Sequence, residues 1–200
     1  MDNVSMNIDD DSYIDHLKEV RKEEQALVER LMGERLYLGE ALRIDALTGL
    51  HNRKIFPKIR DIGTVVMCDL DDFKTVNDTF GHAMGDEVLR ALGRTISDNI
   101  RIGDVGIRYG GDEFIIVFTT DKKEVIDSRM KKIAEDYNRA MHLPGYRLTI
   151  SIGVAFNTNK EKLEVLIRKA DEAAYHSKQN GKDQITYYDQ IGKQKIKEGN

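Results

Sequence analysis

The sequence of 200 residues is poor in features that define several large classes of protein. Its single cysteine, Cys68, excludes an internal disulfide and favours a reducing compartment. No apolar run approaches the roughly 20 residues of a membrane-spanning helix, and the acidic N-terminus lacks the basic and apolar regions of a signal peptide. The five histidines are scattered without the spacing of zinc ligands. We therefore expect a cytoplasmic protein with no membrane partner.

Neither basic nor acidic residues are in large excess. The 31 basic and 35 acidic residues leave a net charge of −4, so we expect no nucleic-acid polymer as a partner. The length suits one domain of ordinary size plus an extension. Cys68 lies in the apolar run TVVMC, which favours buried packing over catalysis.

The N-terminal part of the chain predicts a helix. Residues 1–11 are acidic, and we expect them to be disordered; residues 12–44 are proline-free and rich in helix formers. A heptad frame puts six apolar residues and two glutamates at its a and d positions: Leu17, Val20, Glu24, Leu27, Leu31, Glu34, Leu38 and Ala41. The apolar positions favour a signalling or dimerisation helix that could also receive a regulatory partner. The two glutamates favour a charged helix packed on its own domain, and both interpretations stay open.

Residues 45–190 have the pattern of a domain, and the polar tail at 191–200 is expected to be flexible. Residues 45–54 are turn-like. Strands are predicted at 63–70, 105–109, 114–118, 146–156 and 185–189, and helices at 71–80, 84–100, 122–141 and 161–179. This order predicts an α/β sandwich in which helices cover a mixed sheet built around a hairpin.

The predicted hairpin carries two adjacent acids at its tip. The strands at 105–109 and 114–118 flank Gly110 and Gly111, which are expected to supply the positive φ angles of a tight turn. A plain hairpin explains these glycines but gives no task to Asp112 and Glu113.

A third acid ends the strand at 63–70. Alternation puts Asp69 on the face of Val65 and Met67, whereas Asp71 and Asp72 are expected to cap the next helix. If this strand pairs with the hairpin, Asp69 comes close to the acid pair at its tip. Neighbouring carboxylates repel one another unless a cation holds them, and oxygen ligands without histidine or cysteine suit Mg²⁺. The pattern therefore suggests metal-assisted phosphoryl or nucleotidyl transfer.

Polar residues surround the turn at Gly81. Asn77 and Asp86 could together read donors and acceptors on a purine edge, and a carboxylate such as Asp86 suits guanine. The alternative is that these two residues cap helices and that His82 is an ordinary surface residue.

Six motifs occur in one order along residues 45–189: DALTGLHNR, DLDDFKTVND, GHAMGD, RYGGDEF, TISIGVA and ADEAAYHSKQNGKD. With these motifs the chain resembles the GGDEF domain of diguanylate cyclases. The resemblance implies a nucleotidyl-cyclase or palm-like fold over 45–190. It also implies condensation of two GTP into cyclic di-GMP and two pyrophosphates, across a two-fold homodimer in which each 3′-hydroxyl attacks the other α-phosphate.

The resemblance also implies roles for residues in the reaction. Asp69, Asp112 and the backbone carbonyl of Leu70 would bind two Mg²⁺ ions, with Mn²⁺ as a substitute. Asp112 would also accept the proton of the 3′-hydroxyl, and Glu113 completes the motif. Lys74 would stabilise charge on the phosphates.

The same resemblance assigns the nucleotide contacts. Asn77 and Asp86 would hold guanine with His82 beside it, and the glycines would let the triphosphate approach the backbone. Lys178 and Lys182 match positions that contact the terminal phosphates. Lys182 stands where arginine is commoner, which keeps the charge but loses a forked contact.

Arg101-Ile-Gly-Asp104 matches the RxxD motif at which the family's product binds and inhibits. Arginine stacks on guanine and pairs with phosphate, so the assignment is physically reasonable, with Arg129 as a candidate second arginine. The alternative is an ordinary surface ion pair.

Two other functions compete with an active cyclase. A silent receptor would bind GTP or cyclic di-GMP without turnover, although such domains usually lose the motif acids that are present here. A cyclase for another purine nucleotide is disfavoured by the carboxylate of Asp86.

Overall fold

A computed structural model describes residues 10–141, 143 and 145–191 of the chain. The predicted disordered N-terminus, apart from its last two residues, and the predicted tail at 191–200, apart from its first residue, therefore lie outside the described residues. The chain divides into two units, Met1–Leu42 and Arg43–Asn200, the first of which contains helix α1 (Asp10–Ala41). This helix begins two residues before the predicted start at 12 and ends before the predicted end at 44. Among the described residues, no helix is both long enough and apolar enough to cross a membrane.

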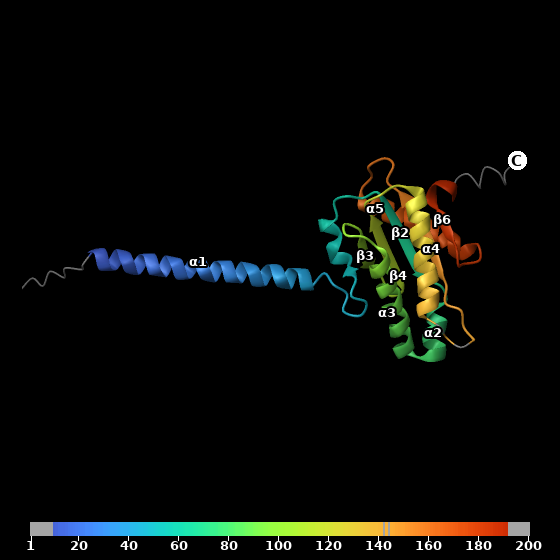
Figure 1. The fold of residues 1–200 in the computed structure, drawn as a ribbon, viewed down its shortest axis with the longest axis horizontal. Helices are drawn as coiled ribbons and strands as arrows, with labels where there is room; N and C mark the ends of the chain where they lie inside the picture. The colour runs from blue at the N-terminus through green and yellow to red at the C-terminus, as the bar shows by residue number, and fades with distance from the viewer. Residues whose placement is uncertain (1–9, 142, 144, 192–200) are drawn as a thin grey trace, which may run out of the picture. The chain divides into compact units, whose positions relative to one another are not determined.

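The second unit is built on a mixed sheet of six strands, in the order β1-β3-β4-β2-β5-β6. Strands β2, β3, β4 and β6 are labelled in Figure 1. Its strands are β1 (His51–Asn52), β2 (Thr64–Leu70), β3 (Val105–Arg108), β4 (Glu113–Phe118), β5 (Ile150–Phe156) and β6 (Ile185–Tyr187). Strand β2 is central and pairs antiparallel with both β4 and β5. The predicted pairing of the 63–70 strand with the hairpin is therefore confirmed.

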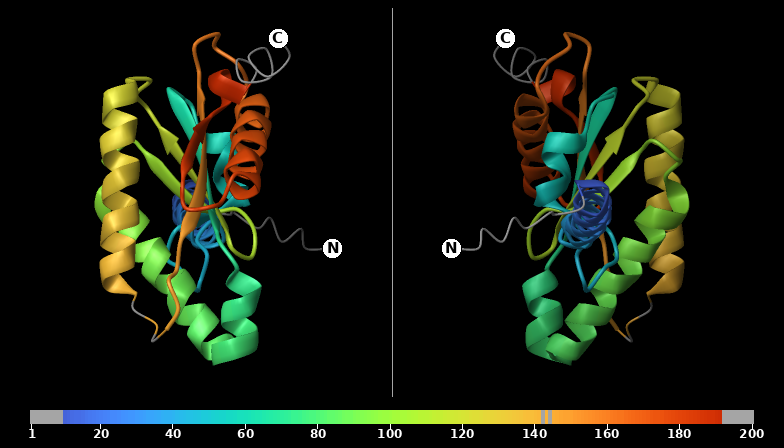
Figure 2. Two further views of the ribbon diagram at one scale, coloured as in Figure 1. Left: turned by 90° about the vertical axis from the view of Figure 1, so that its right-hand side faces the viewer. Right: turned by 90° about the vertical axis from the view of Figure 1, so that its left-hand side faces the viewer.

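Helices cover this mixed sheet, as the sequence predicted, and they lie on both of its faces. They are the 3-10 helix η1 (Arg53–Lys58) and the α-helices α2 (Phe73–Phe80), α3 (His82–Asn99), α4 (Lys123–Ala140) and α5 (Leu163–Gln179). Helices α3 and α4 lie against one face, and α5 and η1 lie against the other (Figure 2). The predicted metal-binding acids lie at one end of β2 and of the β3–β4 hairpin.

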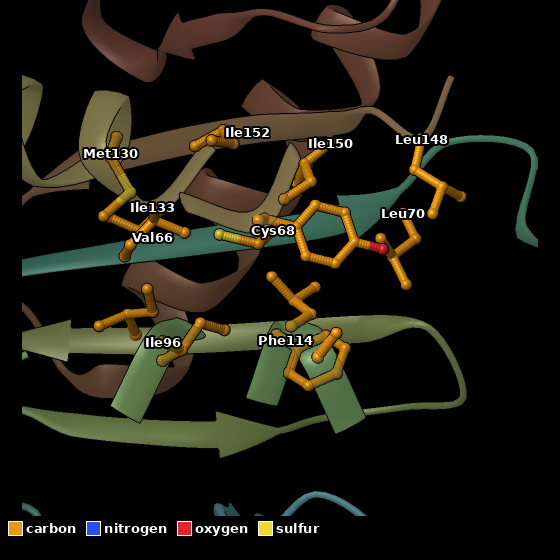
Figure 3. Packing of buried hydrophobic residues seen from close by; sticks show 14 of the residues in the cluster. Val66, Cys68, Leu70, Ile96, Phe114, Met130, Ile133, Leu148, Ile150 and Ile152 are labelled. Atoms are coloured by element: carbon orange, nitrogen blue, oxygen red, sulfur yellow. The ribbon is translucent and has the colours of Figure 1, made fainter. Parts of the chain in front are cut away.

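Alternation along β2 separates the two cores. Val66 and Cys68 face the α3–α4 side, where Figure 3 shows them among side chains from α3, α4 and β5. Val65 and Met67 face the α5 side. All four are at most 2% exposed, and burial raises the pKa of the Cys68 thiol to about 12, so the prediction of a buried packing cysteine is confirmed. Truncating a fully buried aromatic such as Phe114 in such a core costs about 3–5 kcal/mol.

Helix α5 packs unusually close to the sheet because β5 contains Gly153. A Cβ at this position would overlap the backbone of Ala170 and Ala174 in α5. The close approach fixes the C-terminal end of α5, which carries Lys178, relative to β2 and β5. The close packing of α5 on β5 therefore explains why glycine stands at this position of the TISIGVA motif.

Strand β1 and helix η1, which lie in or next to the segment predicted to be turn-like, were not predicted from the sequence. Several bounds also differ: α3 begins at His82, β5 at Ile150 and α5 at Leu163, each a few residues from the predicted start. Strand β6 ends at Tyr187, and residues 188–191 are helical. Ile191 is buried and so belongs to the domain and not to a flexible tail.

Candidate active site

The register of β2 and β4 brings the three predicted acids to one end of the sheet. Asp69 lies directly opposite Glu113, and the backbone N–H of Leu70 donates to the carbonyl of Asp112 at 3.3 Å. Because directly paired residues on neighbouring strands have Cβ atoms about 5 Å apart, Asp69 and Glu113 share one patch of the sheet edge. The convergence expected from the sequence is confirmed.

Asp69 lies in an environment that disfavours its ionised form. Burial raises its pKa to about 6; the Lys178 ammonium opposes this, and the negative charges of Asp112 and Glu113 add to it. The Lys178 nitrogen lies 2.6 Å from Oδ1 of Asp69, whose side chain is 14% exposed. This contact is an ion pair without hydrogen-bond geometry, so the buried Oδ1 has no hydrogen-bond partner among the described residues. A divalent cation at Oδ1 would offset the repulsion from Asp112 and Glu113 more strongly than the single charge of the ammonium.

The donor set suits a hard divalent ion with few protein ligands. No three His, Cys, Asp or Glu side chains converge on one point within the described part of the chain. Asp69, Asp112 and the Leu70 carbonyl could supply two carboxylates and one backbone oxygen, and Mg²⁺ usually takes one or two carboxylates plus waters and substrate phosphates. The residues therefore fit a magnesium ion that binds together with a phosphate-bearing substrate.

The glycines of the hairpin do not act as predicted. Neither Gly110 nor Gly111 has a left-handed φ, so the expectation of positive φ angles is wrong. The turn is instead closed by the N–H groups of Tyr109 and Gly110, which both donate to the carbonyl of Glu113 at 2.8 and 3.1 Å. A Cβ on Gly110 would overlap Oε2 of Glu113, whereas a Cβ on Gly111 would meet no atom within 4 Å. Gly111 thus leaves open space beside Asp112.

Arg108 braces the hairpin, a role that no local pattern in the sequence indicated. Its guanidinium donates to the carbonyl of Gly111 at 2.8 and 3.2 Å and lies 3.3 Å from Oδ1 of Asp45. Asp45 also accepts from the backbone N–H and hydroxyl of Thr48, at 2.9 and 2.7 Å. Burial alone would raise the pKa of Asp45, but the Thr48 hydrogen bonds and the Arg108 charge outweigh it and hold this pKa below its usual value.

Asp71 and Asp72 do not cap α2 as expected. Asp72 precedes the helix with φ +54° and makes no capping hydrogen bond; its carboxylate instead accepts from Lys182 at 2.7 and 2.8 Å. Asp71 is 3% exposed and is hydrogen-bonded to Thr149 and Ser151. Both carboxylates therefore accept hydrogen bonds from other segments of the chain and not from the start of α2.

The two predicted phosphate contacts approach the acids from the end of α5. Lys178 reaches Asp69, and Lys182 reaches Asp72, so each lysine is paired with a carboxylate on the β2–α2 segment. Lys182 is about half-exposed, and its hydrogen bond to Asp72 is the first cause of its raised pKa, to which the charge of Asp72 adds. The structure therefore brings both lysines beside the acids, as the site requires.

The predicted guanine contacts lie on α2 and α3. The Asn77 amide packs against the backbone of Gly85, where a Cβ would overlap its Oδ1. Asp86 is partly exposed and lies 3.8 Å from Arg90, a long ion pair that leaves its carboxylate accessible. Neither residue caps a helix, so the capping alternative is wrong. Lys74 and His82 are exposed at the starts of α2 and α3.

The RxxD segment forms a tight turn after α3. Asp104 accepts from the N–H of Arg101 at 3.1 Å and from the N–H and hydroxyl of Thr119 at 3.0 and 3.2 Å. Among the described residues no ion pair joins Arg101 to Asp104, so the surface ion-pair interpretation is wrong. The Arg101 side chain is exposed, and Arg129 of α4 donates to the carbonyl of Asn99 nearby, at 3.3 Å.

Fold and site together define a class of protein in which acids gather where a central strand meets the tip of a hairpin. Residues 42–184 match the family described as diguanylate cyclase, GGDEF domain, and the chain belongs to this family. The chain is similar to the diguanylate cyclase DgcM of Escherichia coli, with 33% identity over 159 residues that cover 74% of this chain and 39% of that protein. It is 38% identical over 160 residues to the diguanylate cyclase DosC of Escherichia coli, covering 71% of this chain and 34% of that protein. The chain thus spans well under half the length of these relatives.

Two solved structures have the same fold. The coiled coil and GGDEF domain of DgcB from Caulobacter crescentus, in complex with c-di-GMP, superposes with a TM-score of 0.75 and 27% identity, covering 86% of this chain and 98% of that one. The diguanylate cyclase SiaD from Pseudomonas aeruginosa, in complex with its activator SiaC, superposes with a TM-score of 0.70 and 26% identity, covering 88% and 73%.

Proposed function

We propose that this chain is a diguanylate cyclase, which condenses two GTP molecules into cyclic di-GMP and releases two pyrophosphates. The observation that carries the proposal is the pairing of Asp69 with Glu113, which puts the motif acids at one sheet end, within reach of the Lys178 ammonium. Membership of the family and the cyclases among its relatives support the same reaction.

The residues around this end can share the chemistry as follows. Asp69, Asp112 and the carbonyl of Leu70 would hold Mg²⁺ or Mn²⁺, which supplies charge stabilisation at the phosphates and acidifies the attacking hydroxyl. Asp112 accepts the 3′-hydroxyl proton as the oxygen attacks the α-phosphate of the other GTP. The pyrophosphate leaves as the new phosphodiester forms.

Binding residues would orient the nucleotide for this attack. Asn77 and Asp86 would hold the guanine edge, with His82 close by. Lys74, Lys178 and Lys182 would neutralise the phosphates. The last two already lie beside the acids, paired with Asp69 and Asp72, which supports their role as phosphate ligands. The role of Glu113 is to complete the acidic patch opposite Asp69.

Two further features belong to the proposal. Product would inhibit at Arg101 and Asp104, with Arg129 as a nearby second arginine, and the binding of c-di-GMP by the DgcB structure supports this. Helix α1 would bring two chains together in a homodimer or receive a regulatory partner, which the SiaD–SiaC complex supports.

The direct test is to incubate the purified chain with GTP and Mg²⁺ and to identify the nucleotides by chromatography and mass spectrometry. The same assay is run on a fusion that enforces dimerisation through residues 12–44. Cyclic di-GMP from either form supports the proposal. Retained GTP without product from the enforced dimer would favour a silent receptor instead.

A further inference from the structure

Asp71 is the most buried charged residue beside the proposed active site. It is 3% exposed, and both of its carboxylate oxygens are hydrogen-bonded. Oδ1 accepts from the Ser151 hydroxyl at 2.7 Å. Oδ2 accepts from the Thr149 hydroxyl at 2.7 Å and from the backbone N–H of Asp183 at 3.2 Å. Burying a carboxylate is costly unless such donors surround it, so these contacts define one geometry.

The three donors come from segments that are distant in sequence. Asp71 follows β2, Thr149 and Ser151 lie at the start of β5, and Asp183 follows α5. The backbone of Asp71 also contributes to this connection, because its N–H donates to the carbonyl of Thr149 at 3.0 Å. One side chain therefore ties the turn after α5 to the strand end that carries Asp69.

The turn held by Asp71 has an unfavourable backbone. Gly181, Lys182 and Asp183 have consecutive φ angles of +107°, +61° and +46°. Residues other than glycine seldom adopt this region, and they persist there only where the surroundings hold them. Within the turn the N–H of Lys182 donates to the carbonyl of Ser177 at 3.0 Å, and the N–H of Asp183 donates to Asp71.

The residue presented by this turn is the lysine that reaches the acids. Lys182 projects its ammonium to Asp72, the residue after Asp71, which has a left-handed φ of +54° itself. The described residues include four with a left-handed φ that are not glycine, and three of them lie next to Asp71 or its contacts. Asp72 follows Asp71, Asp183 donates to it, and Lys182 precedes Asp183. The strain is concentrated where the Asp71 carboxylate can hold it.

We infer that Asp71 is a positioning residue, whose buried carboxylate holds the left-handed turn that aims Lys182 at the terminal phosphates of the nucleotide. The inference rests on the proposed function for the phosphate contact. The lock itself, between Asp71 and the Asp183 amide, is a property of the free domain and can be measured without nucleotide.

The first experiment measures hydrogen exchange of the Asp183 amide in the full chain. Asp71→Ala removes all three contacts, and we expect exchange at Asp183 to accelerate at least about tenfold. Asp71→Asn restores protection, because its amide oxygen can accept from Thr149 and Asp183 while its NH₂ donates to the Ser151 hydroxyl. Exposed Asp171 on α5 provides the matched control, and Asp171→Ala leaves the Asp183 amide protected.

The second experiment compares the affinities of 3′-deoxy-GTP and 3′-deoxy-GMP, which lack the attacking hydroxyl and so bind without turnover. We expect Asp71→Ala to weaken the triphosphate about tenfold and to leave the monophosphate nearly unchanged, because a charge-assisted phosphate contact is lost. Asp71→Asn restores the ratio. If Asp71→Ala fails to fold, Thr149→Val removes one donor and shifts the ratio in the same direction by less.

The outcomes separate this inference from the proposed function. Equal weakening of both nucleotides, or an unchanged Asp183 amide in Asp71→Ala, would overturn the positioning role. If the wild-type protein binds the triphosphate no better than the monophosphate, the proposed phosphate contact fails, and the aiming role of Asp71 fails with it. Protection of the Asp183 amide would then still decide whether the lock exists.

Discussion

The Lys178 ammonium lies 2.6 Å from Oδ1 of Asp69, so a predicted phosphate ligand neutralises a predicted metal ligand in the free domain. The two partners lie on different elements, α5 and β2, which Gly153 allows to approach closely. A cation at Oδ1 and the ammonium at Oδ1 are mutually exclusive. Binding of metal should therefore release Lys178 toward the phosphates.

This exclusion predicts that Lys178→Gln binds Mn²⁺ more tightly than the wild type in the absence of nucleotide. The gain should be about fivefold above pH 7, since the competing pair is partly exposed. Titration of Mn²⁺ by electron paramagnetic resonance measures it. Lys169→Gln is the matched control, because Lys169 lies on the same helix as Lys178 and pairs with Glu161, which precedes that helix and is not among the predicted metal ligands. An unchanged or weaker affinity in Lys178→Gln would contradict the exclusion.

The open space at Gly111 predicts a variant that folds but binds poorly. Gly111→Ala meets no atom within 4 Å and needs no left-handed φ, so stability should be unchanged or higher by about 0.4–1 kcal/mol. Its affinity for GTP should fall, because the methyl group obstructs approach of the triphosphate to the backbone. Thermal unfolding and GTP titration measure the two effects. Gly153→Ala should instead unfold the domain, because its methyl group would overlap the backbone of α5. Full GTP affinity in Gly111→Ala would contradict the close approach of the triphosphate to the backbone at Gly111.

The lowered pKa of Asp45 predicts a pH-dependent contribution to stability. Asp45→Asn should lower the free energy of unfolding by about 1–3 kcal/mol at pH 7, through weaker contacts to Arg108 and Thr48. A carboxylate whose folded pKa lies below its unfolded value of about 3.9 stabilises above that pH. The difference between variant and wild type should therefore vanish as the pH falls through the folded pKa.

Urea unfolding at several pH values measures this contribution. Glu135→Gln is the control, because the pair of Glu135 with Lys131 is exposed and long, at 3.9 Å, and should change stability by less than about 0.5 kcal/mol. A constant difference between Asp45→Asn and the wild type down to about pH 2 would contradict the assignment.

The turn at 101–104 predicts which variant tests product inhibition cleanly. Arg101 is exposed, so Arg101→Ala should leave the melting temperature unchanged and remove the early plateau of product formation. Asp104 holds the turn through Thr119, so its substitution would confound folding with inhibition. Arg94→Ala, exposed on α3, is the control. A plateau that persists in Arg101→Ala would exclude the site.

The alternation of apolar and polar residues was enough to predict the longer strands and the face on which their side chains lie. The alternation of the TVVMC run put Asp69 on the α5 side of the sheet, and the hairpin flanks predicted β3 and β4. Strand β1 has two residues and η1 has six, too few for a period to emerge.

Contacts between distant residues could not be predicted in this way. Asp71 binds Ser151 and Asp183, which are 80 and 112 residues away, and Arg108 binds Asp45 across 63 residues. Local rules made helix capping the natural role for Asp71, and only the packed structure supplied better donors. The hairpin glycines were likewise identified for the wrong reason, because neither has a positive φ: Gly110 makes room for the Glu113 side chain, and Gly111 leaves open space beside Asp112.

The central claim is tested most directly by comparing wild type and Asp112→Asn as enforced dimers, with GTP consumption and cyclic di-GMP formation followed together. The account predicts one cyclic product for every two GTP consumed by the wild type. It predicts at least about a hundredfold slower formation by Asp112→Asn, with its fold retained. Equal rates for the two proteins, or GTP consumed without any cyclic product, would contradict it.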